Sequence, residues 1–311
     1  KASTGGVVSG SGSSAAATVS PDVYAGIAGS VSVDNDVDVD AHALSSAVAS
    51  ATGKSLVSGV TVGTSSASGW NTSGVAAAVD ADAVTAGGDI SIRSALNDDG
   101  RTGLDVYASG SHGNKFALIS ATGTLASGTM NTTVAASLAG SSHLTAGGDV
   151  DIVSESANTA KVVADANAGG ILAFGATLAD TSMTANTLTT IGDDATIVAG
   201  GNGDIRSDAS QTVLSFVEGG AGKTTSDVLS EAFENLISGN ISGFFSSIST
   251  PSLTAAGASY LTVNLDSLAK TVIGDGATLT YSGDLNIKAL SDTAIGATAL
   301  MKSGGLVGPD A

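Results

Sequence analysis

Short runs in which apolar and polar residues alternate recur along the chain. In residues 90–92, 150–152 and 285–287, two aliphatic residues flank one polar residue. A period of two places the aliphatic side chains on one face of an extended segment and the polar side chain on the other. The chain is therefore predicted to be all-β, with strands that are buried on one side.

A phrase of nine residues contains each of these runs and occurs four times, at 84–92, 144–152, 197–205 and 279–287. Each copy holds a glycine followed by an aspartate. Glycine accepts the positive φ of tight turns, and an aspartate side chain bonds nearby backbone N–H groups. The phrase predicts a turn between two strands. The predicted turn residues are Gly88, Asp89, Gly148, Asp149, Gly203, Asp204, Gly283 and Asp284.

The spacing of the phrase indicates a repeat protein. Its aspartates lie 60, 55 and 80 residues apart. Repeats of tens of residues are typical of solenoids, in which each coil buries its inner face against its neighbours. Since ordinary coils hold a few tens of residues, we expect two or three coils per interval and a rod of about 50 Å. Residues 1–311 are predicted to form one continuous solenoid segment, and the opening Lys1 suggests a fragment of a longer chain.

The longest interval holds a segment that breaks the β pattern. Apolar residues recur at helical spacing behind Ser226 or Asp227, either of which can cap a helix. A short helical insertion near 226–248 is therefore expected, within an excursion of the chain over 218–250. Its apolar face predicts either a packing lid or a contact with a partner. The candidate contact residues are Phe233, Leu236, Phe244 and Phe245.

Composition supports a thin core. The chain holds 42 glycines and 3 prolines, and aromatic residues make up 4%. Large aromatic side chains normally bury the most area in a compact core, so small side chains must fill this one. Disorder is the competing reading of a sequence rich in glycine and serine, but the mean hydropathy of +0.31 and the β-branched alternation argue against it.

Charge and cysteine content limit the partners. The formal net charge of −18 excludes nucleic acid and anionic membrane surfaces, because both require a basic patch. The chain has no cysteine, which excludes disulfides and thiol chemistry. No apolar run is long enough to insert into a membrane. An acidic surface suits a protein exposed outside the cell.

Acidic residues offer one candidate metal site. Asp34, Asp36 and Asp38 lie in a predicted strand over 31–39, in which valine and aspartate alternate with a break at Asn35, and Asp204 follows a glycine-rich turn. Carboxylate oxygens are natural calcium ligands, so these four residues are calcium candidates. A solvated strand face is the alternative reading. No other cofactor is expected.

No catalytic residue is predicted. The glycine-rich stretch 219–224 lacks the first glycine of a phosphate-binding loop, and the histidines His42, His112 and His143 are expected at surfaces or corners. An enzyme on a β-helix would need carboxylates clustered with arginine or lysine. Arg93 and Arg206 fall in separate repeats, which argues for a structural role.

The phrase Ile-Gly-Asp-Gly-Ala-Thr-Leu-Thr followed by Gly-Asp-Leu, at 273–285, resembles repeats of giant bacterial adhesins. The similar proteins are of the filamentous-haemagglutinin and leukotoxin-like filamentous adhesin type. The resemblance implies a right-handed parallel β-helix, secretion to the cell surface, and a structural or adhesive role without catalysis. It implies partners that are neighbouring copies or segments of the same protein, arranged end to end, and host or cell-surface glycans or proteins. A carbohydrate-active β-helix enzyme and a calcium-stabilised surface-layer protein are the alternatives.

Overall fold

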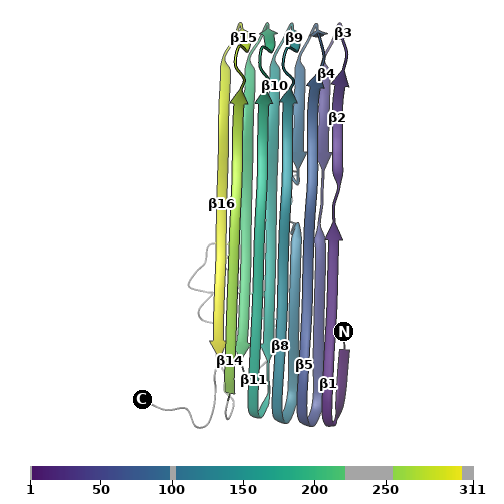
Figure 1. Cartoon of the computed structure of the whole chain (residues 1–311), viewed down its shortest axis with the longest axis vertical. Coiled ribbons are helices and arrows are strands. Elements are labelled where there is room, and N and C mark those ends of the chain that lie inside the picture. The colour runs from purple at the N-terminus through teal and green to yellow at the C-terminus, as the bar shows by residue number, and fades with distance from the viewer. Residues whose placement is uncertain (1, 99–102, 221–254, 303–311) are drawn as a thin grey trace, which may run out of the picture.

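The computed structural model describes residues 2–98, 103–220 and 255–302 of the chain, and these are β-strands joined by turns. All strand pairs are parallel, which confirms the predicted all-β solenoid (Figure 1). The expected helix near 226–248 and the contact residues Phe233, Leu236, Phe244 and Phe245 lie outside the described residues. Within the described ranges, no helix is long and apolar enough to cross a membrane.

One coil shows the path that every coil follows. Strand β11 (Gly170–Ile191) rises along the length of the molecule, and a turn leads into the short strand β12 (Thr196–Ala199). A second turn leads into β13 (Gly203–Gly220), which descends. Each coil therefore has two long sides and one short side at the top (Figure 1).

The other strands repeat this path, and the long strands β5 and β8 continue around the bottom bend from a descending into a rising part. Their bounds are β1 (Ala2–Val19), β2 (Asp22–Ala28), β3 (Val31–Val33), β4 (Val37–Ala43), β5 (Ala47–Asp80), β6 (Val84–Ala86), β7 (Ile90–Leu96), β8 (Val106–Leu138), β9 (His143–Ala146), β10 (Val150–Asn167), β14 (Ala255–Ile273), β15 (Thr278–Tyr281) and β16 (Leu285–Lys302).

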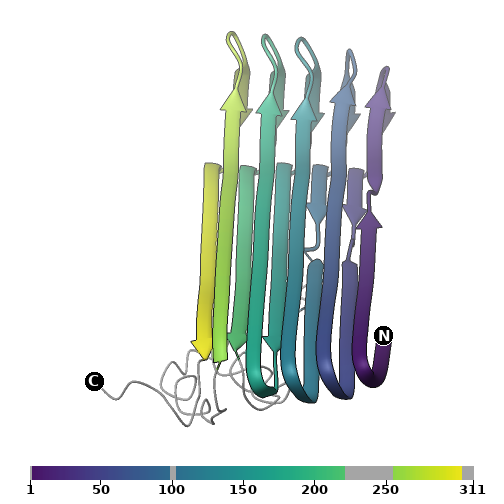
Figure 2. The same ribbon diagram turned by 60° about the horizontal axis from the view of Figure 1, so that its bottom comes forward.

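The rising strands form one wall and the descending strands the other (Figure 2). We call them the front wall, which faces the viewer in Figure 1, and the back wall. The chain rises in front, descends behind and advances from right to left in Figure 1, so the coil is right-handed as predicted. The short strands β3, β6, β9, β12 and β15 form a separate five-stranded sheet that closes the top.

Each repeat interval is a single coil, which corrects the expected two or three. Val37, Ile90, Val150, Gly203 and Leu285 stack directly on one another along the back wall. The described residues therefore form five coils. The expected rod along the stacking direction is also wrong, because the strands themselves define the long axis: 18 residues of β13 span about 60 Å.

The interior between the walls changes character along the strands. Near the top it is aliphatic, with Ile92, Leu138, Ile152, Ile191 and Ile205 almost fully buried. Further down, small residues dominate, as in the cluster that includes Ala67, Ala126 and Ala179. The predicted core of small side chains is therefore found in the lower part, whereas large aliphatic side chains fill the upper part.

Buried hydroxyl groups bond across the interior, and the sequence patterns did not indicate them. Thr181 of the front wall and Ser215 of the back wall are fully buried, with 3.0 Å between their oxygens. Ser156 and Thr187 form a second such pair at 2.7 Å. Since a buried hydroxyl without a partner costs free energy, these bonds specify which positions of the two walls face each other.

We predict that Thr181 and Ser215 are energetically coupled. Thr181→Val or Ser215→Ala alone leaves one buried hydroxyl unpaired and should lower the free energy of unfolding by about 1–3 kcal/mol. The double variant should cost less than the sum of the two single variants. Denaturant unfolding of the four proteins measures the coupling, and strictly additive losses would contradict it.

Candidate functional site

A chain of side-chain hydrogen bonds runs through the turns at the top of the back wall. Asp36 accepts a bond from the backbone N–H of Asp89 at 2.9 Å, and Asp89 accepts one from Asp149 at 2.8 Å. Asp149 accepts from Asn202 at 2.6 Å, and Asn202 accepts from Asp284 at 3.0 Å. We call this series the turn ladder. Asp89, Asp149 and Asp284 lie in these turns, and each has a bond to a neighbouring coil.

The prediction for the fourth coil was shifted by two residues. Asn202 occupies the ladder position there, and Gly203 begins β13. Asp204 lies within the strand and stacks on Asp151. Aligning Gly203-Asp204 with the Gly-Asp pairs of the other copies was therefore wrong. Asn202 takes the place because its side-chain carbonyl accepts a hydrogen bond as a carboxylate does.

Close stacking explains why glycine precedes each ladder residue. A Cβ atom added to Gly88, Gly148, Gly201 or Gly283 would lie less than 3.0 Å from the ladder oxygen of the preceding coil. The expected positive φ is not the reason, because the described glycines with positive φ are elsewhere, at Gly29 and Gly276. Glycine therefore makes room for the aspartate or asparagine of the preceding coil.

The calcium candidates are divided between two places. Residues 34–36 form the turn of the first coil, between β3 and β4, so the expected continuous strand is interrupted. Asp38 lies in β4, and Asp204 lies three coils away, paired with Arg206 at 2.8 Å. Among the residues that the structure describes, no group of three acidic or histidine side chains could hold a metal ion.

Charged residues from three coils meet on the outer face of the back wall. Arg93 of β7 and Arg206 of β13 lie on either side of Val153 in β10, and both donate hydrogen bonds to Glu155. Asp98 pairs with Arg93 at 3.0 Å. The structure thus unites arginines that the sequence places in separate repeats. Sequence reasoning missed Glu155, although the equivalent places of the two arginines in the repeat could have indicated an acidic partner between them.

The carboxylates of this charged cluster differ in pKa. Burial raises the pKa of Glu155, but bonds from Arg206 and Asp98 and the charge of Arg93 outweigh it, so the net pKa is lowered. Burial and the adjacent Glu155 raise the pKa of Asp98 above its usual value. Burial, followed by the charge of Asp204, also raises the pKa of Asp151. Glu155 therefore acts as a stable anion that holds two arginines.

A buried histidine lies near the bottom of the interior, where a surface or corner position was expected. His112 is fully buried, and burial lowers its pKa. Its Nδ1 lies 3.3 Å from the Ser65 hydroxyl, and its Nε2 lies 3.4 Å from that of Ser11. Added Cβ atoms on Gly53 and Gly63 would meet the imidazole ring, so both glycines make room for it. The residue is a neutral core histidine.

A hollow of about 520 Å³ lies on the back wall where β7 gives way to β8. Leu44, Asn97, Asp105 and Asn158 are among its lining residues. Asp105 accepts a bond from the backbone N–H of Thr159 at 2.6 Å. The arginines and Glu155 do not line this hollow, so the charged cluster lies outside it.

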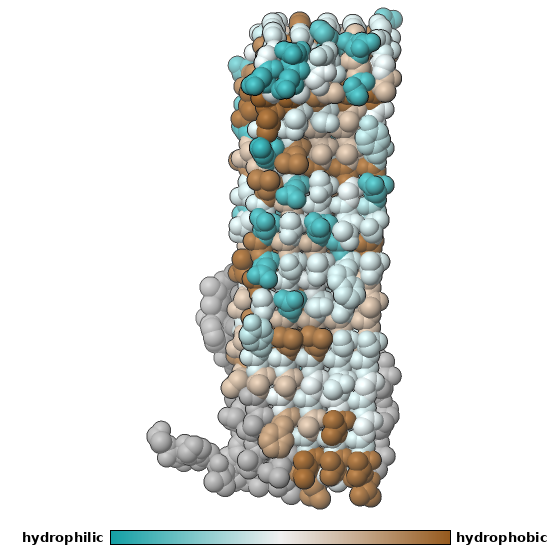
Figure 3. All heavy atoms as spheres, viewed as in Figure 1, coloured by the Kyte–Doolittle hydropathy of each residue, from teal (hydrophilic) through white to brown (hydrophobic). Residues whose placement is uncertain are grey.

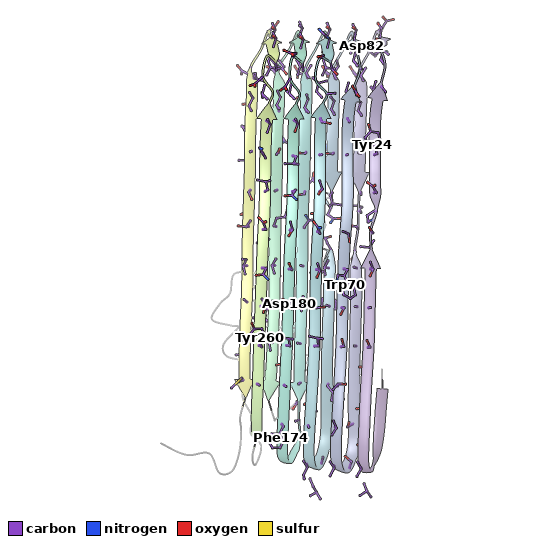
Figure 4. All side chains as sticks on the ribbon, in the orientation of Figure 1. Tyr24, Trp70, Asp82, Phe174, Asp180 and Tyr260 are labelled. Carbon is purple, nitrogen blue, oxygen red and sulfur yellow. The ribbon has the colours of Figure 1, made fainter. Side chains whose placement is uncertain are left out.

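The front wall carries a different surface. The described strand β11 holds a single charged residue, Asp180, and this wall is mostly pale in the hydropathy view (Figure 3). Four aromatic residues project from it at separate heights (Figure 4). Tyr24, Trp70, Phe174 and Tyr260 are 39–70% exposed. The front wall is therefore a sparsely charged surface with scattered aromatic rings.

We predict that Gly148 and Asp89 are coupled. Gly148→Ala places a methyl group against the Asp89 carboxylate and should lower the free energy of unfolding by about 1–3 kcal/mol. In an Asp89→Ala background the same change should cost less, because the obstructing carboxylate is gone. Gly113→Ala is the control, since an added Cβ there meets nothing within 4 Å. An equal loss in both backgrounds, measured by denaturant unfolding, would refute the steric explanation.

Removal of the Glu155 charge should give a pH-dependent loss of stability. The lowered folded-state pKa means that the Glu155 carboxylate stabilises the fold at pH values above its unfolded pKa of about 4.3. This stabilisation is lost as the pH falls through the folded-state pKa. Glu155→Gln should cost about 1–2 kcal/mol at pH 7, since its partner Arg93 is half exposed, and the difference should shrink in acid. Asp180→Asn on the front wall is the control. A pH-independent difference in thermal unfolding would argue against this ion pairing.

No family model, no curated protein and no solved structure matches the chain.

Proposed function

We propose that this chain is an extracellular structural or adhesive segment of a bacterial surface protein, without catalysis. The observation that carries the proposal is the uninterrupted parallel register from the first coil to β16. Such stacked coils build long, flat walls around a filled interior. The net charge of −18 and the resemblance of the repeat to giant adhesins support a role outside the cell.

The last described strand offers an open edge. Ile287 and Ile295 occupy inward positions of β16 and are 48% and 57% exposed, whereas their equivalents Ile205 and Val213 one coil earlier are fully buried. An open edge strand pairs readily with another strand. We propose that a further parallel strand of the same protein covers β16, so that the coils described here form one section of a longer stalk.

The front wall suits adhesion. Its surface is broad and carries few charges, and Tyr24, Trp70 and Tyr260 project from it (Figure 4). Exposed aromatic rings are enriched where proteins bind partners. We propose that cell-surface glycans or proteins are bound here.

A carbohydrate-active enzyme is the second candidate. The cluster of Arg93, Asp98, Glu155 and Arg206 has the carboxylates and cations that such an enzyme requires. Against it, both oxygens of Glu155 are bonded to arginines, and the cluster lies outside the hollow on the back wall. The structural role is therefore preferred.

The stalk proposal predicts different effects for two substitutions in β16. Ile295→Lys places a charge in the continuing interior, so the chain should no longer assemble into surface material when it is expressed within its parent protein in the source cells. Leu290→Lys, the matched control, changes an outward residue of the same strand and should assemble normally. Antibody labelling of intact cells measures the amount at the surface.

Two results would contradict the structural proposal. One is intracellular retention of the unaltered protein, with no labelling before the cells are opened. The other is depolymerisation of a polysaccharide by the purified chain that Glu155→Gln abolishes, which would favour the enzyme.

A further inference from the structure

The lower part of the front wall carries a row of large exposed side chains. Leu125, Leu178 and Tyr260 occupy the same outward position in three neighbouring coils and are 36–64% exposed. We call this row the ridge. Exposed apolar side chains that adjoin one another mark interaction sites, whereas single exposed ones are ordinary. The ridge therefore calls for a partner.

A groove runs beside the ridge, across the strands. Its floor holds small residues that precede the ridge residues by two positions on the same strands, namely Gly123, Ala176 and Ala258. A hollow of about 730 Å³ lies over this floor, and the ridge residues line one side of it. None of the described residues that line the hollow is charged. Ridge and groove are thus parallel to the stacking direction and about 6.7 Å apart.

The surface around the ridge and the groove carries few charges. We call it the shared strip, and it comprises the outward positions of residues 10–16, 62–68, 121–127, 174–180 and 258–262. Asp180, at its upper border, is the one charged residue in these ranges. This part of the front wall is white to brown where it is coloured in Figure 3. The acidic residues of the described chain lie mainly in the turns and on the back wall.

A second copy of the chain has the shape that fits the groove, because ridge and groove are neighbours on one wall. A two-fold axis along the stacking direction, between the two features, places the front walls face to face. Leu125 of one copy then meets Gly123 of the other, and Leu178 meets Ala176. Each contact occurs twice, since a two-fold interface is self-complementary. Large side chains thus meet small ones across the gap of about 10 Å that is usual between packed sheets.

The area of the shared strip is sufficient for a weak dimer. Four outward positions on five strands cover about 650 Å² per copy, and specific interfaces bury about 600–1,000 Å² per partner. Asp180 lies at the rim, where polar groups stay in contact with water. Physiological salt screens the repulsion between two chains of net charge −18. The shared strip therefore meets the requirements of size and charge for contact with a second copy.

We propose that two copies of this chain associate side by side through their front walls, with the ridge of each copy in the groove of the other. The two-fold axis leaves both stacking directions parallel, an arrangement that suits two stalks anchored on one surface. Tyr24 and Trp70 lie above the shared strip, at the levels proposed for ligand binding (Figure 4). The inference goes beyond the proposed surface role and does not depend on it.

Sedimentation equilibrium of the whole chain at physiological ionic strength tests the association. We expect a monomer–dimer equilibrium with a dissociation constant of about 1–100 µM, as for interfaces at the small end of the range. No larger species should form, because a two-fold contact is complete with two copies. Association through the open edge of β16 would instead continue beyond the dimer.

Three variants test the fit of ridge to groove. Ala176→Leu fills the groove opposite Leu178 and should weaken the dimer about tenfold or more, although it makes the wall more apolar. Ala176→Leu combined with Leu178→Ala exchanges ridge and groove in one coil and should restore the dimer. Val48→Leu is the control, since it enlarges an exposed apolar side chain on the back wall and should have no effect. Circular dichroism verifies that each variant folds.

Three outcomes would overturn the inference. A chain that stays monomeric up to about millimolar concentration would leave the ridge to a partner of another kind. An Ala176→Leu protein that dimerises as strongly as the unaltered chain would reveal a non-specific apolar contact. Oligomers that grow beyond the dimer would point to the strand edges. None of these outcomes bears on whether the protein is displayed at a cell surface, which the antibody labelling decides.

Discussion

The structure depends on one constraint: each paired residue of a strand or turn lies beside its equivalent in the preceding coil, at the strand spacing of about 4.8 Å. At this distance a side chain in one coil limits the choice in the next. Asp89 accepts the Asp149 N–H and excludes any side chain larger than hydrogen at Gly148. Glu155 pairs with Arg93 and Arg206, which the same stacking places in the two coils on either side of it. The turns, the charged cluster and the interior all follow from this close stacking of the coils.

The sequence was sufficient for the fold class because strand alternation and turn chemistry are local properties. The alternation at 150–152 and the glycine before Asp149 indicated a strand that follows a turn, and the recurrence of the phrase indicated a solenoid. The coil size was misjudged, since the phrase marks one corner and says nothing about how long the walls are. Long walls of Ala, Ser and Thr carry little periodic signal of their own.

The candidate site was less predictable, because its members come from different coils. The ladder residue Asn202 was missed because a nearby Gly-Asp pair matched the phrase better in letters, although only the hydrogen bond from Asn202 to Asp149 defines equivalence. The partnership of Arg93, Glu155 and Arg206 required knowing that one interval equals one coil. His112 was misplaced because nothing local distinguishes a buried histidine from an exposed one, and Gly53 and Gly63, which make room for it, lie far away in sequence.

The charged cluster has a mechanical consequence. A force that pulls the two chain ends apart along the stacking direction acts on the coils in turn, so the outermost strands would peel away one hydrogen bond at a time. Glu155 links the second, third and fourth coils through side chains, in addition to their backbone bonds. To separate the middle coils, peeling must therefore break these side-chain bonds together with the backbone bonds. In a stalk under tension, these three coils would be the last to separate.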